Sequence, residues 1–486
     1  MRLALFLPSI ALGALAFAGA LGITSGAGPG LDPDSMSYLQ AGTTLAHGAG
    51  LRDVERDWSS ADSTKALAHW PPGYSIVIAG AERAGFGAVQ GARFIGAIAA
   101  CITVATVVWI VGGVAGIGAG IIAGLLVLVT PAVVQVHESV LSEPLFIALL
   151  VLTLAAMMRA PERPWASGLL AGLASIVRYA GVSLVGGVVL WQLARAGTVR
   201  QRIARAVVAA IPAIVILGAW VLRTVHSAGP SAIRKISVYG ELTSTLREGW
   251  RTTSAWLVPG MGEVWGIVVA AGVAALLVVA VRESRPLRAQ QRPAIAAVLL
   301  AACYLGLVLA SRLIADPGIP LDDRMMAPLL VLLEIAIVLV VAPAWRVWPA
   351  PARALVVLFV ALWWGAALRV SGQSARYAVR TGNDFAEDCW RNSPLVAWVR
   401  ANGEGHALFT NAPEPLYFHT GRLARELPEE RDAKSLAAFA DTLSRRNGLV
   451  VAFDETCGAL NKDDSLLARM PLREIATMPT GRVLER

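Results

Sequence analysis

Charged residues are scarce in this chain of 486 residues: they make up 16% of it, whereas hydrophobic residues make up 56%. Soluble proteins carry about a quarter of their residues as Asp, Glu, Lys or Arg, so this composition excludes an ordinary set of soluble domains. Uncharged runs cover residues 3–23, 102–134 and 264–281. Each reaches the ~18 residues that cross a ~30 Å hydrocarbon core. The chain is therefore predicted to be a polytopic membrane protein, with its first run retained as a helix.

Cysteine is also scarce, because the chain holds only four. This number and their spacing exclude a zinc finger and a CxxC redox motif. Cys101 and Cys303 fall inside apolar runs, where buried thiols are ordinary. Cys389 and Cys457 lie in the polar C-terminal region. They are candidates for a disulfide if that region lies outside the cytoplasm.

Basic residues give the chain a net charge of +8, but they gather in short loops between apolar runs. Such loops mark the cytoplasmic side of a membrane protein, and this distribution argues against a nucleic-acid-binding face. The two main clusters are Arg195, Arg200, Arg202 and Arg205, and Arg282, Arg285, Arg288 and Arg292. Assigning them to the cytoplasm places the long first loop, residues 24–88, and the tail, residues 370–486, on the outer face of the cytoplasmic (inner) membrane.

The same assignment predicts about eleven membrane segments within residues 1–369. Residues 165–193 have basic flanks on both sides, so this stretch should enter the membrane and return as a broken pair of short helices. Arg178 and Tyr179 would then lie near the tip, beside a cavity. The alternative is one long tilted helix, which would invert the topology downstream. The tail has mixed charge and short apolar runs such as 448–453. It is predicted to be a small α/β domain, which makes the whole chain a mainly α, polytopic membrane protein.

The first loop contains two carboxylates, Asp32 and Asp34, on either side of Pro33. Asp34 is a good helix N-cap, but a cap explains only one of the two aspartates. His69, in the motif HWPPGY, is either a functional proton carrier or phosphate partner or a solvated loop residue.

Three further charges fall in or beside apolar runs on the predicted outer side. Glu143 is costly there unless it faces a cavity or a cation, although it also suits the first turn of a helix. Arg178 should meet an anion, either a phosphate or Glu143 itself. Arg324, next to Asp323, opposes the dipole of the helix that it begins, so it either serves a ligand or acidic neighbour or is a solvated loop charge. Together these groups offer a general base and cations for an anionic leaving group.

The order and sidedness of these motifs resemble the GT-C superfamily of membrane glycosyltransferases, which includes protein O-mannosyltransferases and the lipid A aminoarabinose transferase. The resemblance covers roughly residues 1–345. Its marks are DPDSMSYLQAGTTLAHGAGL, HWPPGY, SEPLF, GLLAGLASIVRYAG and DDRMMAPL.

This resemblance implies transfer of a sugar from a polyprenyl-phosphate donor to an acceptor hydroxyl at the outer face, with inversion. Asp34, four residues before Tyr38, would be the general base, with Asp32 as the other candidate. The expected substrate-binding residues are Tyr38, His69, Glu143, Arg178, Tyr179, Asp323 and Arg324. Many relatives show Asp-Glu where this chain has Asp-Pro-Asp, so the need for a divalent cation, held by Asp32 and Glu143, stays open.

The expected partners are the lipid-linked donor, a glycan, lipid or protein acceptor of the cell envelope, and membrane lipids, without nucleic acid. Two other classes of protein remain open. One is a transporter or flippase for a lipid-linked or anionic solute, gated by Arg178 and Glu143. The other is a non-catalytic assembly factor for envelope glycans.

Overall fold

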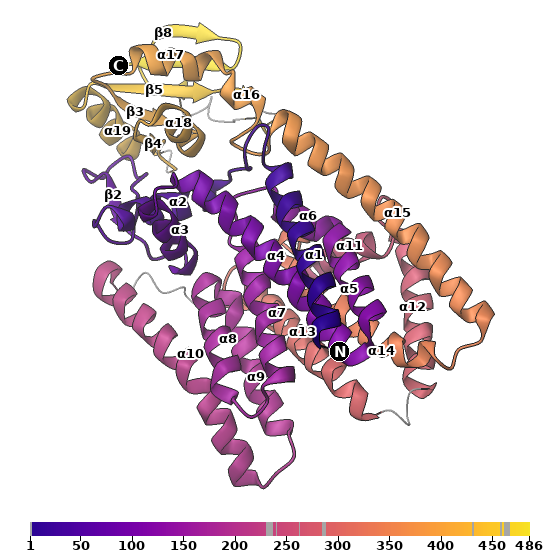
Figure 1. Cartoon of the computed structure of the whole chain (residues 1–486). Coiled ribbons are helices and arrows are strands. Elements are labelled where there is room, and N and C mark those ends of the chain that lie inside the picture. The colour runs from indigo at the N-terminus through magenta and orange to yellow at the C-terminus, as the bar shows by residue number, and fades with distance from the viewer. Residues whose placement is uncertain are drawn as a thin grey trace.

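The computed structural model describes residues 2–229, 237–239, 241–261, 263–283, 288–429, 432–456, 459–460 and 467–486. This part of the chain is mainly helical, as predicted (Figure 1). Seven described helices are long and apolar enough to cross a membrane, and three shorter apolar helices accompany them. The seven are α1 (Arg2–Ile23), α4 (Ala88–Ala115), α10 (Val199–Ala228), α12 (Glu263–Glu283), α13 (Arg288–Ile314), α14 (Asp323–Trp345) and α15 (Ala350–Thr381).

The predicted break within residues 165–193 is present, and the alternative of one long helix is wrong. Helix α8 (Pro164–Val177) ends at Arg178, whose backbone is extended with φ −146° and ψ 136°. A short 3-10 turn, η1 (Tyr179–Gly181), follows and leads into α9 (Val182–Ala194). A second break separates α5 (Ile117–Val129) from α6 (Pro131–Val136). It falls at Pro131, which has no backbone N–H to continue the helical bonding of α5.

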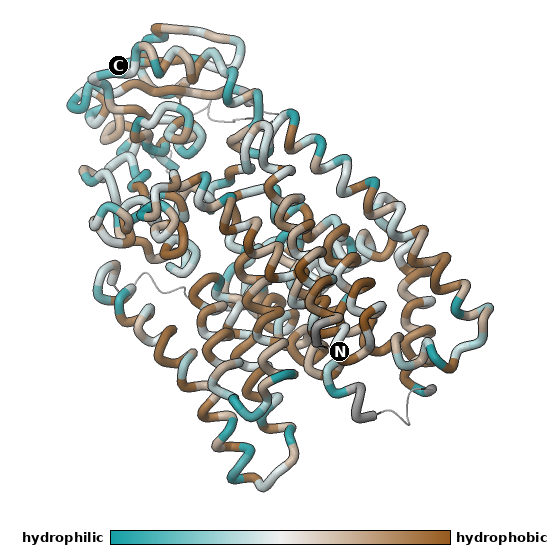
Figure 2. Tube along the Cα trace, in the orientation of Figure 1, coloured by the Kyte–Doolittle hydropathy of each residue, from teal (hydrophilic) through white to brown (hydrophobic). Residues whose placement is uncertain are grey.

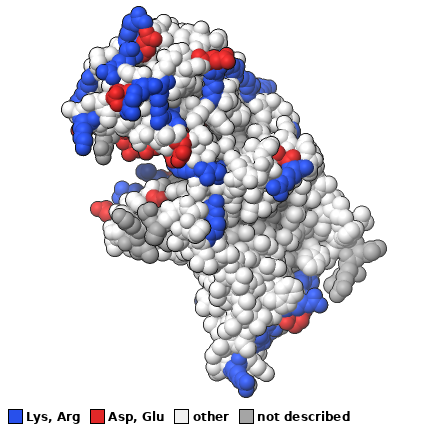
Figure 3. Space-filling model, turned by 90° about the vertical axis from the view of Figure 1, so that its left-hand side faces the viewer, with Lys and Arg blue, Asp and Glu red and all other residues white. Residues whose placement is uncertain are grey.

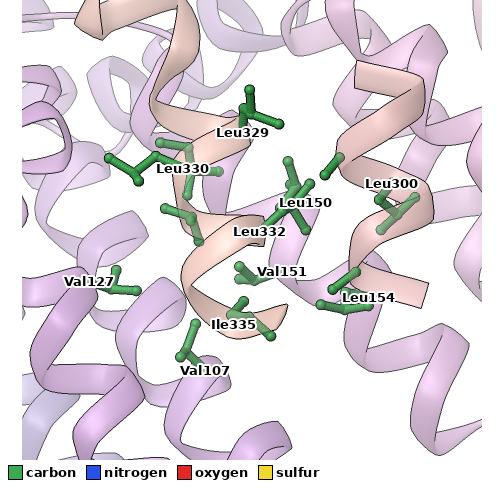
Figure 4. Packing of buried hydrophobic residues seen from close by; sticks show 14 of the residues in the cluster. Val107, Val127, Leu150, Val151, Leu154, Leu300, Leu329, Leu330, Leu332 and Ile335 are labelled. Atoms are coloured by element: carbon green, nitrogen blue, oxygen red, sulfur yellow. The ribbon is translucent and has the colours of Figure 1, made fainter. Parts of the chain in front are cut away.

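The hydrophobic core of the bundle surrounds α14. Leu329, Leu330, Leu332 and Ile335 of this helix are at most 8% exposed. They face Leu150, Val151 and Leu154 of α7 (Glu143–Arg159), with Leu300 of α13, Val107 of α4 and Val127 of α5 in the same cluster (Figure 4). Burial of these aliphatic side chains packs α14 against α7.

The first loop is folded rather than extended. It contains α2 (Pro33–Ala46), the hairpin of β1 (Arg52–Val54) and β2 (Thr64–Ala66), and α3 (Gly73–Arg83), which packs on α2. Asp32, and not Asp34, is the N-cap of α2, because its Oδ1 accepts the Ser35 N–H at 2.7 Å. The expectation that Asp34 caps this helix is therefore wrong: Pro33 takes the first helical position, which places the cap one residue before it.

The C-terminal part contains a five-stranded mixed sheet in the order β4-β3-β5-β9-β8. The predicted apolar run at 448–453 forms β5, its central and fully buried strand. Helices α17 and α18 pack on one face of the sheet and α19 on the other. The elements are α16 (Asp388–Arg391), α17 (Pro394–Asn402), β3 (Ala407–Thr410), α18 (Pro413–Thr420), β4 (Ala424–Glu426), α19 (Ala433–Arg445), β5 (Gly448–Phe453), β6 (Glu455–Thr456), β7 (Ala459–Leu460), β8 (Arg473–Met478) and β9 (Gly481–Glu485).

Three observations on the remaining chain differ from the sequence-based expectations or add to them. Helix α15 continues to Thr381 rather than ending near residue 369, and α11 (Leu242–Leu257) forms between α10 and α12, where no helix was expected. Cys389 is disulfide-bonded. Its expected partner, Cys457, lies outside the described residues.

The polar parts gather at the two ends of the bundle. The C-terminal sheet and the first loop lie together at one end, and the turn between α9 and α10 lies at the other (Figure 1). Hydrophobic segments dominate between these ends (Figure 2). A space-filling view shows Lys, Arg, Asp and Glu concentrated at the two ends and an almost uncharged surface between them (Figure 3). This banding is typical of a protein that crosses a bilayer.

Candidate active site

The chain just before Asp32 is held between two other segments of the protein. Val140 N–H donates to the carbonyl of Gly30 at 2.9 Å, and Phe385 N–H donates to the carbonyl of Leu31 at 2.8 Å. A Cβ atom on Gly30 would lie 2.3 Å from Ser139 Oγ, so a side chain does not fit at this crossing. The α6–α7 connection and the segment after α15 therefore fix the position from which α2 begins.

Arg324, in the first turn of α14, binds three carboxylates. Its Nε donates to Glu143, its Nη1 donates to Asp32 at 2.8 Å, and its Nη2 donates to Asp34. Its own side chain is 27% exposed, those of Asp32 and Asp34 are 18% and 20% exposed, and that of Glu143 is fully buried. The expectation of an acidic neighbour is thus met, and the alternative of a solvated loop charge is wrong.

Arg178, at the break between α8 and α9, also binds Glu143. Its Nη1 lies 2.7 Å from Glu143 Oε1 and 3.0 Å from Ser142 Oγ. In the described part of the chain, Arg178 Nε is buried without a hydrogen-bond partner. Of the two anions proposed for Arg178, the structure therefore supplies Glu143, and one N–H of the guanidinium remains available as a donor.

The five charged groups form one electrostatic unit at the polar end of the bundle. Asp32, Asp34 and Glu143 carry three negative charges, and Arg178 and Arg324 carry two positive ones. Burial raises the pKa of Asp32; Arg324 acts in the opposite direction, while the charge of Asp34 adds to the rise. The unit thus combines carboxylates able to accept a proton with guanidiniums able to bind an anion.

Tyr38 is buried next to this unit and is not exposed to solvent. It is 1% exposed, and its hydroxyl is 3.2 Å from Ser142 Oγ. Its ring meets Tyr74 edge-on, with 5.2 Å between ring centroids. The spacing of four residues puts Tyr38 one turn after Asp34 on α2, but that turn faces the core.

Three other residues named from the sequence contact tryptophans. Tyr179 OH accepts the indole N–H of Trp220 at 3.0 Å, and Asp323 Oδ1 accepts that of Trp256 at 2.8 Å. His69 is exposed, and its ring centroid lies 4.6 Å from that of Trp70. Asp32, Asp34, Glu143, Arg178 and Arg324 are the expected residues that the structure brings together.

Two serines hold the unit in place and were not singled out from the sequence. Ser142 joins Tyr38 and Arg178, and Ser35 Oγ donates to the carbonyl of Val140 at 2.7 Å. Both serines are completely buried. The sequence feature that could have pointed to these serines is a small polar residue next to an acidic one at the edge of an apolar run. The motifs DPDS and SEPLF both contain it.

A divalent cation does not fit the carboxylates as they stand. Asp32 and Glu143, the expected ligands, are both engaged by Arg324. Among the described residues, no group of three or more His, Cys, Asp or Glu has an arrangement that could hold a metal ion. The guanidinium, rather than an ion, occupies the centre of the carboxylates.

The fold is that of the GT-C membrane glycosyltransferases, which confirms the predicted resemblance at the level of the fold. The chain is similar to ArnT from Cupriavidus metallidurans, with 14% sequence identity, coverage of 98% of this chain and 97% of that one, and a TM-score of 0.62 for the apo state. ArnT bound to undecaprenyl phosphate gives a TM-score of 0.60 with the same identity and coverage.

Two other solved structures share the fold over most of this chain. The oligosaccharyltransferase AglB from Archaeoglobus fulgidus, in complex with an inhibitory peptide and a dolichol-phosphate, has 12% identity, covers 92% of this chain and 69% of that one, and gives a TM-score of 0.54. AglB was also solved with Zn and sulfate. The arabinofuranosyltransferase AftD from Mycobacteria has 17% identity, covers 100% of this chain and 40% of that one, and gives a TM-score of 0.56. No family model and no curated protein matches the sequence.

Proposed function

We propose that the chain is a membrane glycosyltransferase that moves a sugar from a polyprenyl-phosphate donor to an acceptor hydroxyl, with inversion. The observation that carries the proposal is the pairing of Asp34 with Arg324, which also binds Glu143, the partner of Arg178, at one polar end of the GT-C fold. The lipid phosphates in the solved complexes of ArnT and AglB support a lipid-phosphate donor, since the chain follows the fold of ArnT over 98% of its length.

The chemistry assigned to Asp34 is that of a general base. Its carboxylate accepts the proton of the acceptor hydroxyl while the hydroxyl oxygen forms a bond to the anomeric carbon. The bond from that carbon to the phosphate oxygen breaks, and its electron pair leaves with the polyprenyl phosphate. Asp34 is preferred over Asp32 because Asp32 is also committed to capping α2.

The two arginines stabilise the leaving phosphate, which gains negative charge as the bond breaks. Arg324 holds Asp34 before the donor arrives. When the donor phosphate binds, it competes for Arg324 and leaves Asp34 less tightly paired and free to accept a proton. Arg178 Nε offers a further donor to the same phosphate. In this proposal the donor both supplies the sugar and releases the base.

The proposal includes about eleven membrane segments in residues 1–369 and an outer-face α/β domain in residues 370–486. It places the reaction at the outer face of the cytoplasmic membrane. Support comes from the arrangement of charge, because α2, which contains Asp34, lies at the same end as the C-terminal sheet, and the basic turn between α9 and α10 lies at the opposite end (Figure 1). Basic loops stay in the cytoplasm.

The test is sugar transfer by full-length protein in membranes supplied with a polyprenyl-phosphate-linked sugar. Asp34→Asn keeps the size of the side chain but removes its basicity, so transfer should fall at least a hundredfold, within the range that general base catalysis supplies. Asp57→Asn, an exposed aspartate of the same loop, is the matched control and should transfer at the wild-type rate. Wild-type transfer by Asp34→Asn would show that Asp34 is not the base.

A further inference from the structure

The unusual feature of the site is that three carboxylates from three distant segments converge on a single guanidinium. Asp32 and Asp34 come from the start of α2, Glu143 from the start of α7, and Arg324 from the start of α14. Each carboxylate binds a different nitrogen of Arg324. Elsewhere in proteins, carboxylates that converge in this way are typical ligands of Mg²⁺, Ca²⁺ or Mn²⁺.

The spacing of the oxygens suits the guanidinium and not an ion. An oxygen that accepts from a guanidinium N–H lies roughly 3.5–4 Å from the central carbon, given ordinary bond and hydrogen-bond lengths. Divalent cations bind oxygens at about 2.0–2.6 Å. While Arg324 is present, the three carboxylates are therefore spaced for its planar guanidinium and are too far apart to coordinate an ion directly. Only removal of this side chain would let them close on a smaller ion.

The charge balance favours the same occupant. Together with Arg178, the cluster has one net negative charge when Arg324 is present. A divalent cation added to it would make the cluster net positive. Without Arg324, the cluster would have two net negative charges, which one divalent cation would cancel.

We propose that Arg324 takes the place of a divalent cation in this site, so that the chain binds no ion there and transfers sugar without one. Arg324 compensates the charge of Asp32, Asp34 and Glu143 and later faces the anionic donor, two tasks that a metal ion performs in other sites. The inference rests on the proposed function for the transfer reaction, but the occupancy of the cluster is measurable without any substrate.

Removing the guanidinium should create a metal site. In Mn²⁺ titrations of the purified full-length protein followed by electron paramagnetic resonance, Arg324→Ala should bind one Mn²⁺ at least tenfold more tightly than the wild type. Adding Asp34→Asn to Arg324→Ala should abolish this gain, because one ligand is lost. Arg312→Ala is the matched control, since Arg312 pairs with one carboxylate, Glu248, and its removal should create no site.

Two results would overturn the inference. One is tight Mn²⁺ binding by the wild type that disappears in Asp34→Asn. The other is a folded Arg324→Ala protein, judged by its gel-filtration profile, that binds Mn²⁺ no better than the wild type. If Arg324→Ala does not fold, Arg324→Gln supports the same titration.

Sugar transfer gives a second readout of the inference. The wild-type rate should be the same in EDTA as in Mn²⁺, and a rate that is lost in EDTA and restored by Mn²⁺ would contradict the inference. Because the Mn²⁺ titration uses neither donor nor acceptor, an absence of sugar transfer would contradict the proposed function and leave the binding result unchanged.

Discussion

At the scale of single residues, Glu143 is the carboxylate that links the two arginines of the charged unit. Its side chain is fully buried and contacts the guanidiniums of both Arg178 and Arg324. Replacing both side chains of a buried ion pair by apolar ones changes the stability of a protein little. Removing only one of them leaves the other charge buried and uncompensated, which destabilises the protein. Glu143 is the shared partner, so its removal affects both arginines, and Arg178 most, since that side chain is 10% exposed.

Glu143→Gln should therefore lower the stability of the protein by about 3–5 kcal/mol, the cost of breaking a buried pair. The measurement is the thermal unfolding midpoint of the purified protein in detergent. The matched control is Asp441→Asn, which removes a carboxylate from an exposed pair, with Arg445 and Asp441 side chains 70% and 61% exposed. Its effect should stay below about 1 kcal/mol. Equal midpoints for the two variants would contradict a structural role for Glu143.

At the scale of elements, the break between α8 and α9 positions Arg178. Gly181, at the end of η1, packs directly against the last turns of α8. A Cβ atom on it would lie 2.4 Å from Ser175 N and 2.5 Å from Ala174 C. These are backbone atoms of a helix, which cannot move aside as the end of a flexible side chain can. The close approach of η1 to α8 therefore requires glycine at this position.

Gly181→Ala should push η1 away from α8 and displace Arg178, three residues earlier, from Glu143. We expect a loss of about 1–3 kcal/mol, as for overpacking elsewhere, and a slower sugar transfer. Gly186→Ala, in α9, is the matched control, because a Cβ atom there has nothing within 4 Å. Thermal unfolding and transfer rates of the two variants would be compared. A Gly181→Ala protein that matches Gly186→Ala in both would show that this contact is not tight.

The elements also show what the sequence could and could not predict. The break at Arg178 was predictable because the charges on both flanks require an even number of crossings. The cap of α2 was open to prediction as well, since Pro33 favours the first helical position and so makes Asp32 the cap. The pairing of Arg324 with Asp34 was not, because the two residues are 290 positions apart and lie on α14 and α2, whose starts meet only in the folded protein. The burial of Tyr38 likewise depends on which face of α2 meets α3.

At the scale of the whole molecule, the first loop and the C-terminal sheet form one polar assembly. Arg425 of β4 donates to the carbonyls of Asp57 and Asp62 at 3.0 and 2.9 Å. Trp58 meets Phe439 of α19 edge-on at 5.4 Å. With so many polar contacts between them, these two parts of the chain must lie on the same side of any membrane that the bundle crosses. The side of the membrane on which they lie is therefore one question for both parts.

Labelling with a membrane-impermeant maleimide answers this question for the full-length protein in intact spheroplasts. Ala61→Cys lies in the exposed first loop and Ala196→Cys in the exposed turn between α9 and α10, so the two alanines form a matched pair at opposite ends of the bundle. If basic loops stay in the cytoplasm, Ala61→Cys should react before permeabilisation and Ala196→Cys only after it. Background from the native cysteines is measured on the unmodified chain. The reverse pattern would place Asp34 on the cytoplasmic side, where the donor sugar would have to be presented from the inner leaflet.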